Sequence, residues 1–76
     1  MANNAPVKNL RDGLIQAAIW ENDAGDSKTF HSVTLTRSYK DGEEWKETTQ
    51  FTGADLLGAS YLLTQAYNEI KVIEQR

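Results

Sequence analysis

The chain has 76 residues, a formal net charge of −3 and no cysteine. A chain of this length forms one domain and buries only about 60% of its unfolded surface, so natural proteins of this size usually add a disulfide, a metal or a second subunit. The missing cysteines exclude disulfides, and a single histidine argues against a structural zinc site. Self-association is left as the expected source of added stability, and we expect a homodimer.

The N-terminal nine residues are polar and show no periodicity. We therefore expect residues 1–9 to form a flexible tail and residues 10–76 to form a single domain. An alternative is that residues 7–11 add a short edge strand ahead of the turn-forming pair Asp12-Gly13.

The first firm strand is expected over residues 14–21, where the side chains alternate with a period of two. Ile15, Ala17 and Ile19 would lie on one face, and Trp20 would lie on the other. Residues 22–28 are dense in turn formers and predict an exposed loop.

A second strand is expected over residues 30–40, which are rich in β-branched and aromatic side chains. Only its odd positions carry large aliphatic residues, Val33 and Leu35, so the odd face should be the core face. The even positions carry Phe30, Lys40 and a run of serines and threonines.

The pair Asp41-Gly42 predicts a hairpin turn into a third strand over residues 45–51. A two-residue turn would place Trp45 and Phe51 on the face opposite the core. A three-residue turn over residues 40–42 would place both on the core face, with Trp45 opposite Arg37. Because a one-residue slip moves every side chain to the other face, the burial pattern favours the three-residue turn.

A helix is expected from residue 52 to about residue 74. Thr52 can cap its first turn, where the Asp55 carboxylate would face the positive end of the helix dipole. The expected core stripe follows helical spacing and is made of Leu56, Ala59, Leu63, Ala66, Tyr67, Ile70 and Ile73, widened by Leu62. A second, thinner stripe that could meet another subunit is made of Leu57, Tyr61 and Val72.

These elements predict an α+β fold, an antiparallel meander of three or four strands followed by one long C-terminal helix packed on one sheet face. A homodimer would form through the helix or through the sheet edges.

The sequence contains no arrangement typical of catalysis. His31 falls on the core face with no nucleophile that must lie beside it, and the glycines are scattered rather than grouped in a phosphate-binding loop. The short acidic runs lack the ligand spacing of a calcium loop. We therefore expect no enzymatic activity, no cofactor, no metal and no small-molecule substrate.

The sheet face opposite the helix is rich in hydroxyl and amide side chains. It should also carry two aromatic residues, Trp20 and Phe30, and two lysines, Lys40 and Lys46. Bases of single-stranded nucleic acid stack on aromatic side chains while lysines contact phosphates, so this face predicts a single-stranded nucleic-acid site. Arg37 is a further candidate.

Two alternatives to these roles stay open. In the favoured register, Arg37 could instead lie over Trp45 as a cation–π partner. The chain could also be a protein-interaction or assembly module, in which Trp20 and Phe30 pack together or become buried between subunits.

The negative net charge argues against strong binding of duplex nucleic acid, which usually needs a basic patch. Single-stranded DNA or RNA is therefore the expected partner. No segment approaches the ~20 apolar residues of a membrane span, and the N-terminus lacks a signal-peptide core. We expect a cytoplasmic protein without a membrane partner.

In element order and size, residues 14–73 resemble the single-stranded DNA-binding fold of the positive cofactor four and Whirly group, without a shared diagnostic motif. The resemblance implies four strands, oligomers and a basic β surface, from which this acidic chain departs. The chain is also similar to a group of short bacterial proteins of unassigned function, in the strings Ile19-Trp20-Glu21-Asn22, Tyr39-Lys40-Asp41-Gly42, Trp45-Lys46 and Asp55-Leu56.

Overall fold

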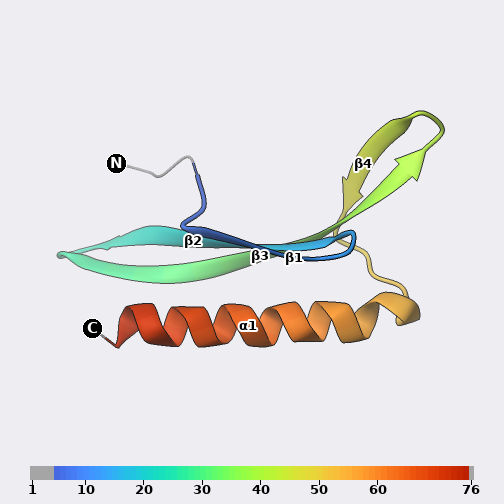
Figure 1. Cartoon of the computed structure of the whole chain (residues 1–76). Helices are drawn as coiled ribbons and strands as arrows, with labels where there is room; N and C mark the ends of the chain where they lie inside the picture. The colour runs from blue at the N-terminus through green and yellow to red at the C-terminus, as the bar shows by residue number, and fades with distance from the viewer. Residues whose placement is uncertain (1–4, 76) are drawn as a thin grey trace.

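The computed structural model describes residues 5–75, which form a four-stranded antiparallel sheet and one long helix (Figure 1). The elements are β1 (Lys8–Asp12), β2 (Ile15–Gly25), β3 (Lys28–Asp41), β4 (Glu44–Thr48), a 3-10 turn (Gly53–Asp55) and α1 (Leu56–Glu74). Sequence neighbours are also sheet neighbours, in the order β1-β2-β3-β4. The predicted α+β meander followed by a C-terminal helix is confirmed.

The core lies between α1 and the middle of the sheet. Helix and strand each contribute three buried residues, which are Ile15, Ala17 and Ile19 from β2 and Ala59, Leu62 and Ala66 from α1. The partly buried residues packed around them are Leu10, Val33, Leu35 and Phe51. The predicted core faces of β2 and β3 are therefore confirmed, because Val33 and Leu35 lie on the helix side.

The helix approaches the β1–β2 hairpin closely at Gly58. A Cβ atom at this position would lie 2.7 Å from the Asp12 Oδ2 atom and 3.2 Å from the Ile15 Cδ1 atom. Both distances are shorter than normal van der Waals contacts, so a larger residue would require the Asp12 carboxylate to turn aside and the Ile15 side chain to shift. The small residues Gly58 and Ala59 thus set how near α1 lies to the sheet.

The strands are longer than the sequence predicted. β1 begins at Lys8, so the alternative edge strand is confirmed and part of the expected tail belongs to the sheet. Residues 1–4 of that tail lie outside the described residues. The expected loop over residues 22–28 is wrong, because β2 and β3 run on to a tight turn at Asp26-Ser27. Both turn residues have positive φ, 53° and 62°, as a type I′ hairpin requires.

The predicted register of the β3–β4 hairpin is wrong. Lys40 pairs with Trp45 and Asp41 pairs with Glu44, so the turn consists of Gly42 and Glu43. Gly42 has a φ of 65°, and glycine at the first central position is typical of a type II′ turn. The register places Trp45 on the face opposite α1.

The bend of the sheet explains this error. The β3–β4 hairpin turns away from α1 (Figure 1), so the helix provides no core for a large residue of β4 to enter. The burial argument for the three-residue turn assumed such a core. β4 ends at Thr48, and Phe51 reaches the core from the connection to the helix instead.

The predicted helix start is confirmed. The backbone N–H and the hydroxyl of Thr52 both donate to the Asp55 Oδ2 atom at 2.9 Å, and the Asp55 N–H donates to the Thr52 carbonyl at 2.9 Å. Thr52 and Asp55 therefore close the first turn as a reciprocal pair, which satisfies groups that the helix cannot pair internally.

These bonds make helix capping sensitive to acid. The Thr52 N–H and then its hydroxyl hold the pKa of Asp55 below its usual 3.8, desolvation opposes them less strongly, and the Arg37 charge adds the smallest lowering. Because the folded-state pKa is the lower one, the stabilisation is present above pH 3.8 and is lost as the pH falls through the folded value.

The acid sensitivity can be tested by urea denaturation of wild type and Asp55→Asn. At about pH 6 wild type should have the larger free energy of unfolding, and this difference should disappear by about pH 2. A constant difference would contradict this assignment.

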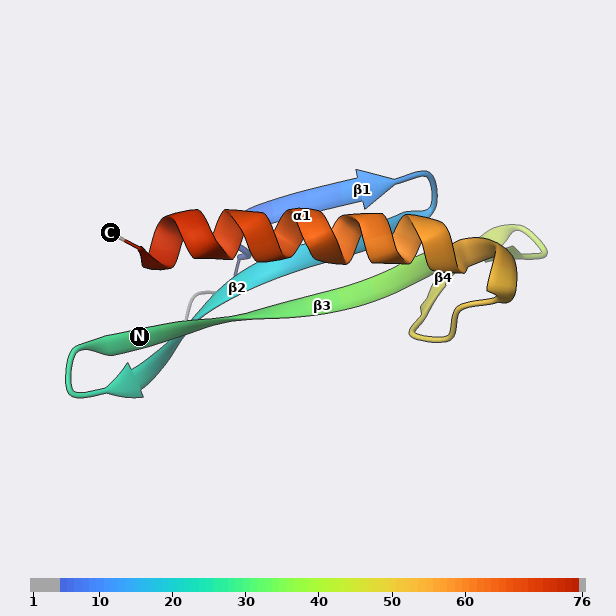
Figure 2. The same ribbon diagram turned by 90° about the horizontal axis from the view of Figure 1, so that it is seen from below.

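The helix packs through one edge of the predicted stripe rather than through its centre. Leu62 is 1% exposed, whereas Leu56, Leu63 and Tyr67 of the predicted stripe are 57%, 46% and 62% exposed. The buried line of Ala59, Leu62 and Ala66 is turned by roughly 45° from the centre of that stripe. Seen from below, α1 runs over β1 and β2 and leaves part of β3 uncovered beside it (Figure 2). Large residues of the stripe therefore point along the sheet rather than into it.

Candidate nucleic-acid interface

The candidate interface is the sheet face opposite α1, which we call the outer face. On β2, the residues of this face alternate with the buried ones. The strand registers add the residues of β1, β3 and β4 that pair with them across the sheet. These residues are Asn9, Arg11, Gln16, Ala18, Trp20, Asn22, Phe30, Ser32, Thr34, Thr36, Ser38, Lys40, Trp45 and Glu47.

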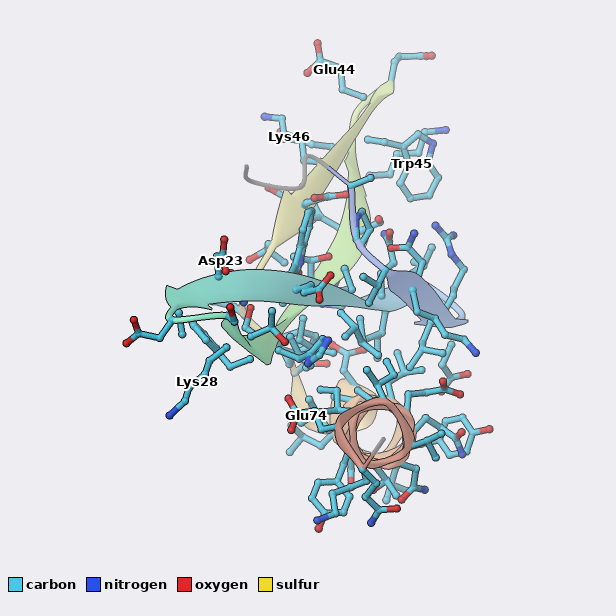
Figure 3. All side chains as sticks on the ribbon, turned by 90° about the vertical axis from the view of Figure 1, so that its left-hand side faces the viewer. Asp23, Lys28, Glu44, Trp45, Lys46 and Glu74 are labelled. Atoms are coloured by element: carbon cyan, nitrogen blue, oxygen red, sulfur yellow. The ribbon has the colours of Figure 1, made fainter. Side chains whose placement is uncertain are left out.

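The outer face is bent. β3 has 14 residues and belongs both to the part of the sheet under which α1 lies and to the hairpin that turns away from the helix (Figure 1). The alternation of side chains continues along β3 into the hairpin, where Trp45 and Lys46 point to opposite sides (Figure 3). Phe30 and Lys40 lie ten positions apart along β3, a span of about 33 Å.

Cross-strand hydrogen bonds fix the middle of the outer face. The Trp20 Nε1–H group donates to the Thr34 hydroxyl at 3.0 Å, and the Gln16 amide donates to the Ser38 hydroxyl at 2.8 Å. The Asn22 amide donates to the Ser32 hydroxyl at 2.9 Å. The indole of Trp20 is thereby held in one orientation on the sheet before any ligand arrives.

Three aromatic side chains lie on this face. Trp20 is half-buried, Phe30 is 50% exposed and Trp45 is 60% exposed. The placement of Trp20 and Phe30 agrees with the sequence prediction. Trp45 was missed because its face depends on a turn whose register the sequence did not reveal.

The charges of the outer face differ from those of the whole chain. The residues that the strand registers place on this face include two cations, Arg11 and Lys40, and one carboxylate, Glu47, in a protein of net charge −3. Asp12 and Glu21 lie on the helix side of the sheet. Near the tip of the β2–β3 hairpin, the Asp23 side chain points away from α1 (Figure 3). Arg11 was missed because the sequence placed the edge strand only as an alternative.

Lys40 lies on the outer face as predicted. Its ammonium is 5.7 Å from the centroid of the Trp45 ring, within the range of a cation–π contact. The two residues are direct partners in the β3–β4 ladder, so they place a cation beside an exposed aromatic ring.

The predicted placement of Lys46 is wrong. Lys46 pairs with Tyr39 in the ladder and lies on the other side of the hairpin from Trp45 (Figure 3). Its ammonium contacts the Asp41 Oδ2 atom at 3.0 Å. The two-residue turn, in place of the predicted three-residue one, reverses the side of every residue of β4, so Lys46 leaves the face that Lys40 occupies.

Arg37 also lies away from the outer face, and its predicted contact with Trp45 is wrong. Its Nε atom lies 3.1 Å from the Asp55 Oδ2 atom, and Nε and Nη2 donate to the Gln50 carbonyl at 3.3 and 3.2 Å. Arg37 therefore ties the segment between β4 and α1 to the sheet.

No metal-binding cluster of three or more His, Cys, Asp or Glu side chains occurs within residues 5–75. Across the same described residues, no helix is both long enough and apolar enough to cross a membrane.

Comparison of the chain with models of protein families, with curated proteins and with solved structures finds no match. The resemblance to the positive cofactor four and Whirly group rests on element order and stays a prediction. Function must therefore be inferred from the chemistry of the outer face.

Proposed function

We propose that the protein binds single-stranded DNA or RNA on the outer face, without catalysis. One observation carries the proposal: three aromatic side chains and two cations share one sheet face, although the chain as a whole is acidic. Aromatic platforms beside cations are the two parts from which sequence-tolerant single-strand sites are built.

Each part of the face has a role in this function. Unpaired bases stack on Trp20, Phe30 and Trp45, while Arg11 and Lys40 contact phosphates. The serine and threonine hydroxyls of this face accept hydrogen bonds that orient the side-chain amides and the Trp20 indole. A duplex keeps its base faces stacked on one another, so aromatic stacking favours single strands over duplex. The lack of cysteine suits a reducing cytoplasm, where we place the protein.

The salt dependence of binding tests the proposed face. Each phosphate contact adds about 0.7 to the slope of log K against log salt for single strands. Lys40→Gln should therefore lower the slope by about 0.7 in fluorescence anisotropy titrations of a labelled, mixed-sequence oligonucleotide. Lys46→Gln is the matched control, because it removes the same charge from the opposite side of the hairpin.

The control variant should bind with the wild-type slope. Equal effects of the two substitutions would mean that only net charge matters, and a larger effect of Lys46→Gln would move the site to the other face. Either result would reject the outer face as the binding surface.

A second candidate function is protein interaction or assembly. It is favoured by the apolar side chains that α1 leaves uncovered, of which Leu57 is 86% exposed. Assembly through the helix and binding on the outer face use opposite sides of the sheet, so both functions can belong to one protein.

A further inference from the structure

An apolar groove runs beside α1 where the helix leaves β3 uncovered. The groove has a volume of about 530 Å³ and is lined mainly by Leu35, Phe51, Leu56, Leu63 and Tyr67. Leu35 comes from β3, Phe51 comes from the connection before the helix, and the other three come from α1. These helix residues are the exposed members of the predicted core stripe.

The core beneath the groove is small for an independent domain. Three of its six buried apolar residues are alanines, and only Ile19 and Leu62 are large and fully buried. The chain has no cysteine with which to form a disulfide. Domains of this size are often stabilised by a further constraint, and a second copy of the chain is one that needs no other component.

We propose that a second copy of the chain covers the groove, with the two α1 helices packed antiparallel about a two-fold axis. The helix face is self-complementary in this arrangement. An axis between residues 61 and 62 places Leu56 of one copy opposite Tyr67 of the other. It also places the small Ser60 opposite the large Leu63, so that large side chains meet small ones, as an isologous interface requires.

The ends of the helices are also complementary in charge. Antiparallel packing sets the positive end of each helix dipole beside the negative end of the other. It brings Lys71 of one copy, a cation of the last helical turn, near the first turn of the other, where Asp55 carries a negative charge. The same register therefore satisfies both the apolar stripe and the helix ends.

The helix supplies part of the area that a dimer needs. A helix of 19 residues is about 28 Å long and about 11 Å wide, a footprint of roughly 300 Å² before the groove is added. Leu35 and Phe51 add to this footprint, which for the helix alone is less than half of the ~800 Å² that each partner buries in a standard interface. The interface lies on the helix side of the sheet, so both outer faces stay open. The inference does not depend on the proposed function.

Sedimentation of the full chain tests the dimer. Wild type should sediment at twice the chain mass of 8.5 kDa. Leu63→Asp should sediment as a monomer, because it introduces a charge at the centre of the contact. The control Leu57→Asp changes a residue about 120° away around the helix and should stay dimeric. A monomeric wild type at concentrations on the order of 0.1 mM would overturn the proposal. So would a dimer that survives Leu63→Asp.

Disulfide trapping gives a result that does not depend on how well a charged variant folds. The chain has no cysteine, so each variant carries a single thiol. The two copies of Ser60→Cys would lie close to the two-fold axis, within the ~7 Å Cα separation that a disulfide spans. Oxidation should link this variant rapidly. Asn68→Cys, on another side of the helix, should stay unlinked. Equal linking of both variants, or none of Ser60→Cys, would reject the antiparallel arrangement.

Discussion

Leu62→Ala is expected to lower the free energy of unfolding by about 2–5 kcal/mol in urea denaturation. Leu62 is 1% exposed and packs against Ile15 and Ala17 at the centre of the core. Its neighbours cannot close the cavity easily, because the Gly58 contact already holds α1 near the sheet. A domain of 76 residues typically has only about 4–11 kcal/mol of stability, so this variant should be close to unfolding.

Leu57→Ala is the control for this effect. Leu57 belongs to the same helix but is 86% exposed, so its truncation should cost less than about 0.5 kcal/mol. Comparable losses in the two variants would show that α1 packs through another face.

The sequence predicted best where a local pattern and a tertiary requirement agree. β2 alternates with a period of two, and the same side chains that share a face, Ile15, Ala17 and Ile19, are the ones that the helix buries. The helix start was predicted for the same reason, because Thr52 and Asp55 satisfy each other within one turn. Both features are settled by residues close in sequence.

The helix face was predicted only in part, because apolar character does not identify which side chains of a stripe face the sheet. The predicted stripe includes the large residues Leu63 and Tyr67, yet the helix packs through its small members Ala59 and Ala66 together with Leu62. Small residues let the backbone of the helix approach the sheet closely. The periodicity of apolar residues does not show where such an approach occurs. The exposed part of the stripe then becomes the groove.

The candidate site was predicted in part. Trp20, Phe30 and Lys40 share the outer face because they lie on β2 and β3, whose pairing follows from the buried pattern. Lys46 and Trp45 lie on the faces opposite to the predicted ones because the turn has two residues rather than the three that the burial pattern favoured. A single residue of turn register decides the side of a whole strand, and the bent hairpin has no core to reveal that register.

Trp20→Ala is expected to weaken single-strand binding by about 1–3 kcal/mol, which is about 5- to 150-fold in affinity. Trp20 lies in the middle of the outer face, and its indole is already oriented by the Thr34 hydroxyl. Little ordering of this side chain is therefore needed when a base stacks on it, so its removal should cost the stacking energy almost in full. Tyr61→Ala is the aromatic control, because Tyr61 is exposed on the helix.

The most direct test of the outer-face site is the anisotropy titration of one labelled single strand at low salt with wild type, Trp20→Ala and Tyr61→Ala. Circular dichroism of each variant would first establish that it is folded. We predict that wild type and Tyr61→Ala bind alike, while folded Trp20→Ala binds about 5- to 150-fold more weakly. Binding by folded Trp20→Ala with wild-type affinity, or no binding by wild type at all, would contradict the proposed function.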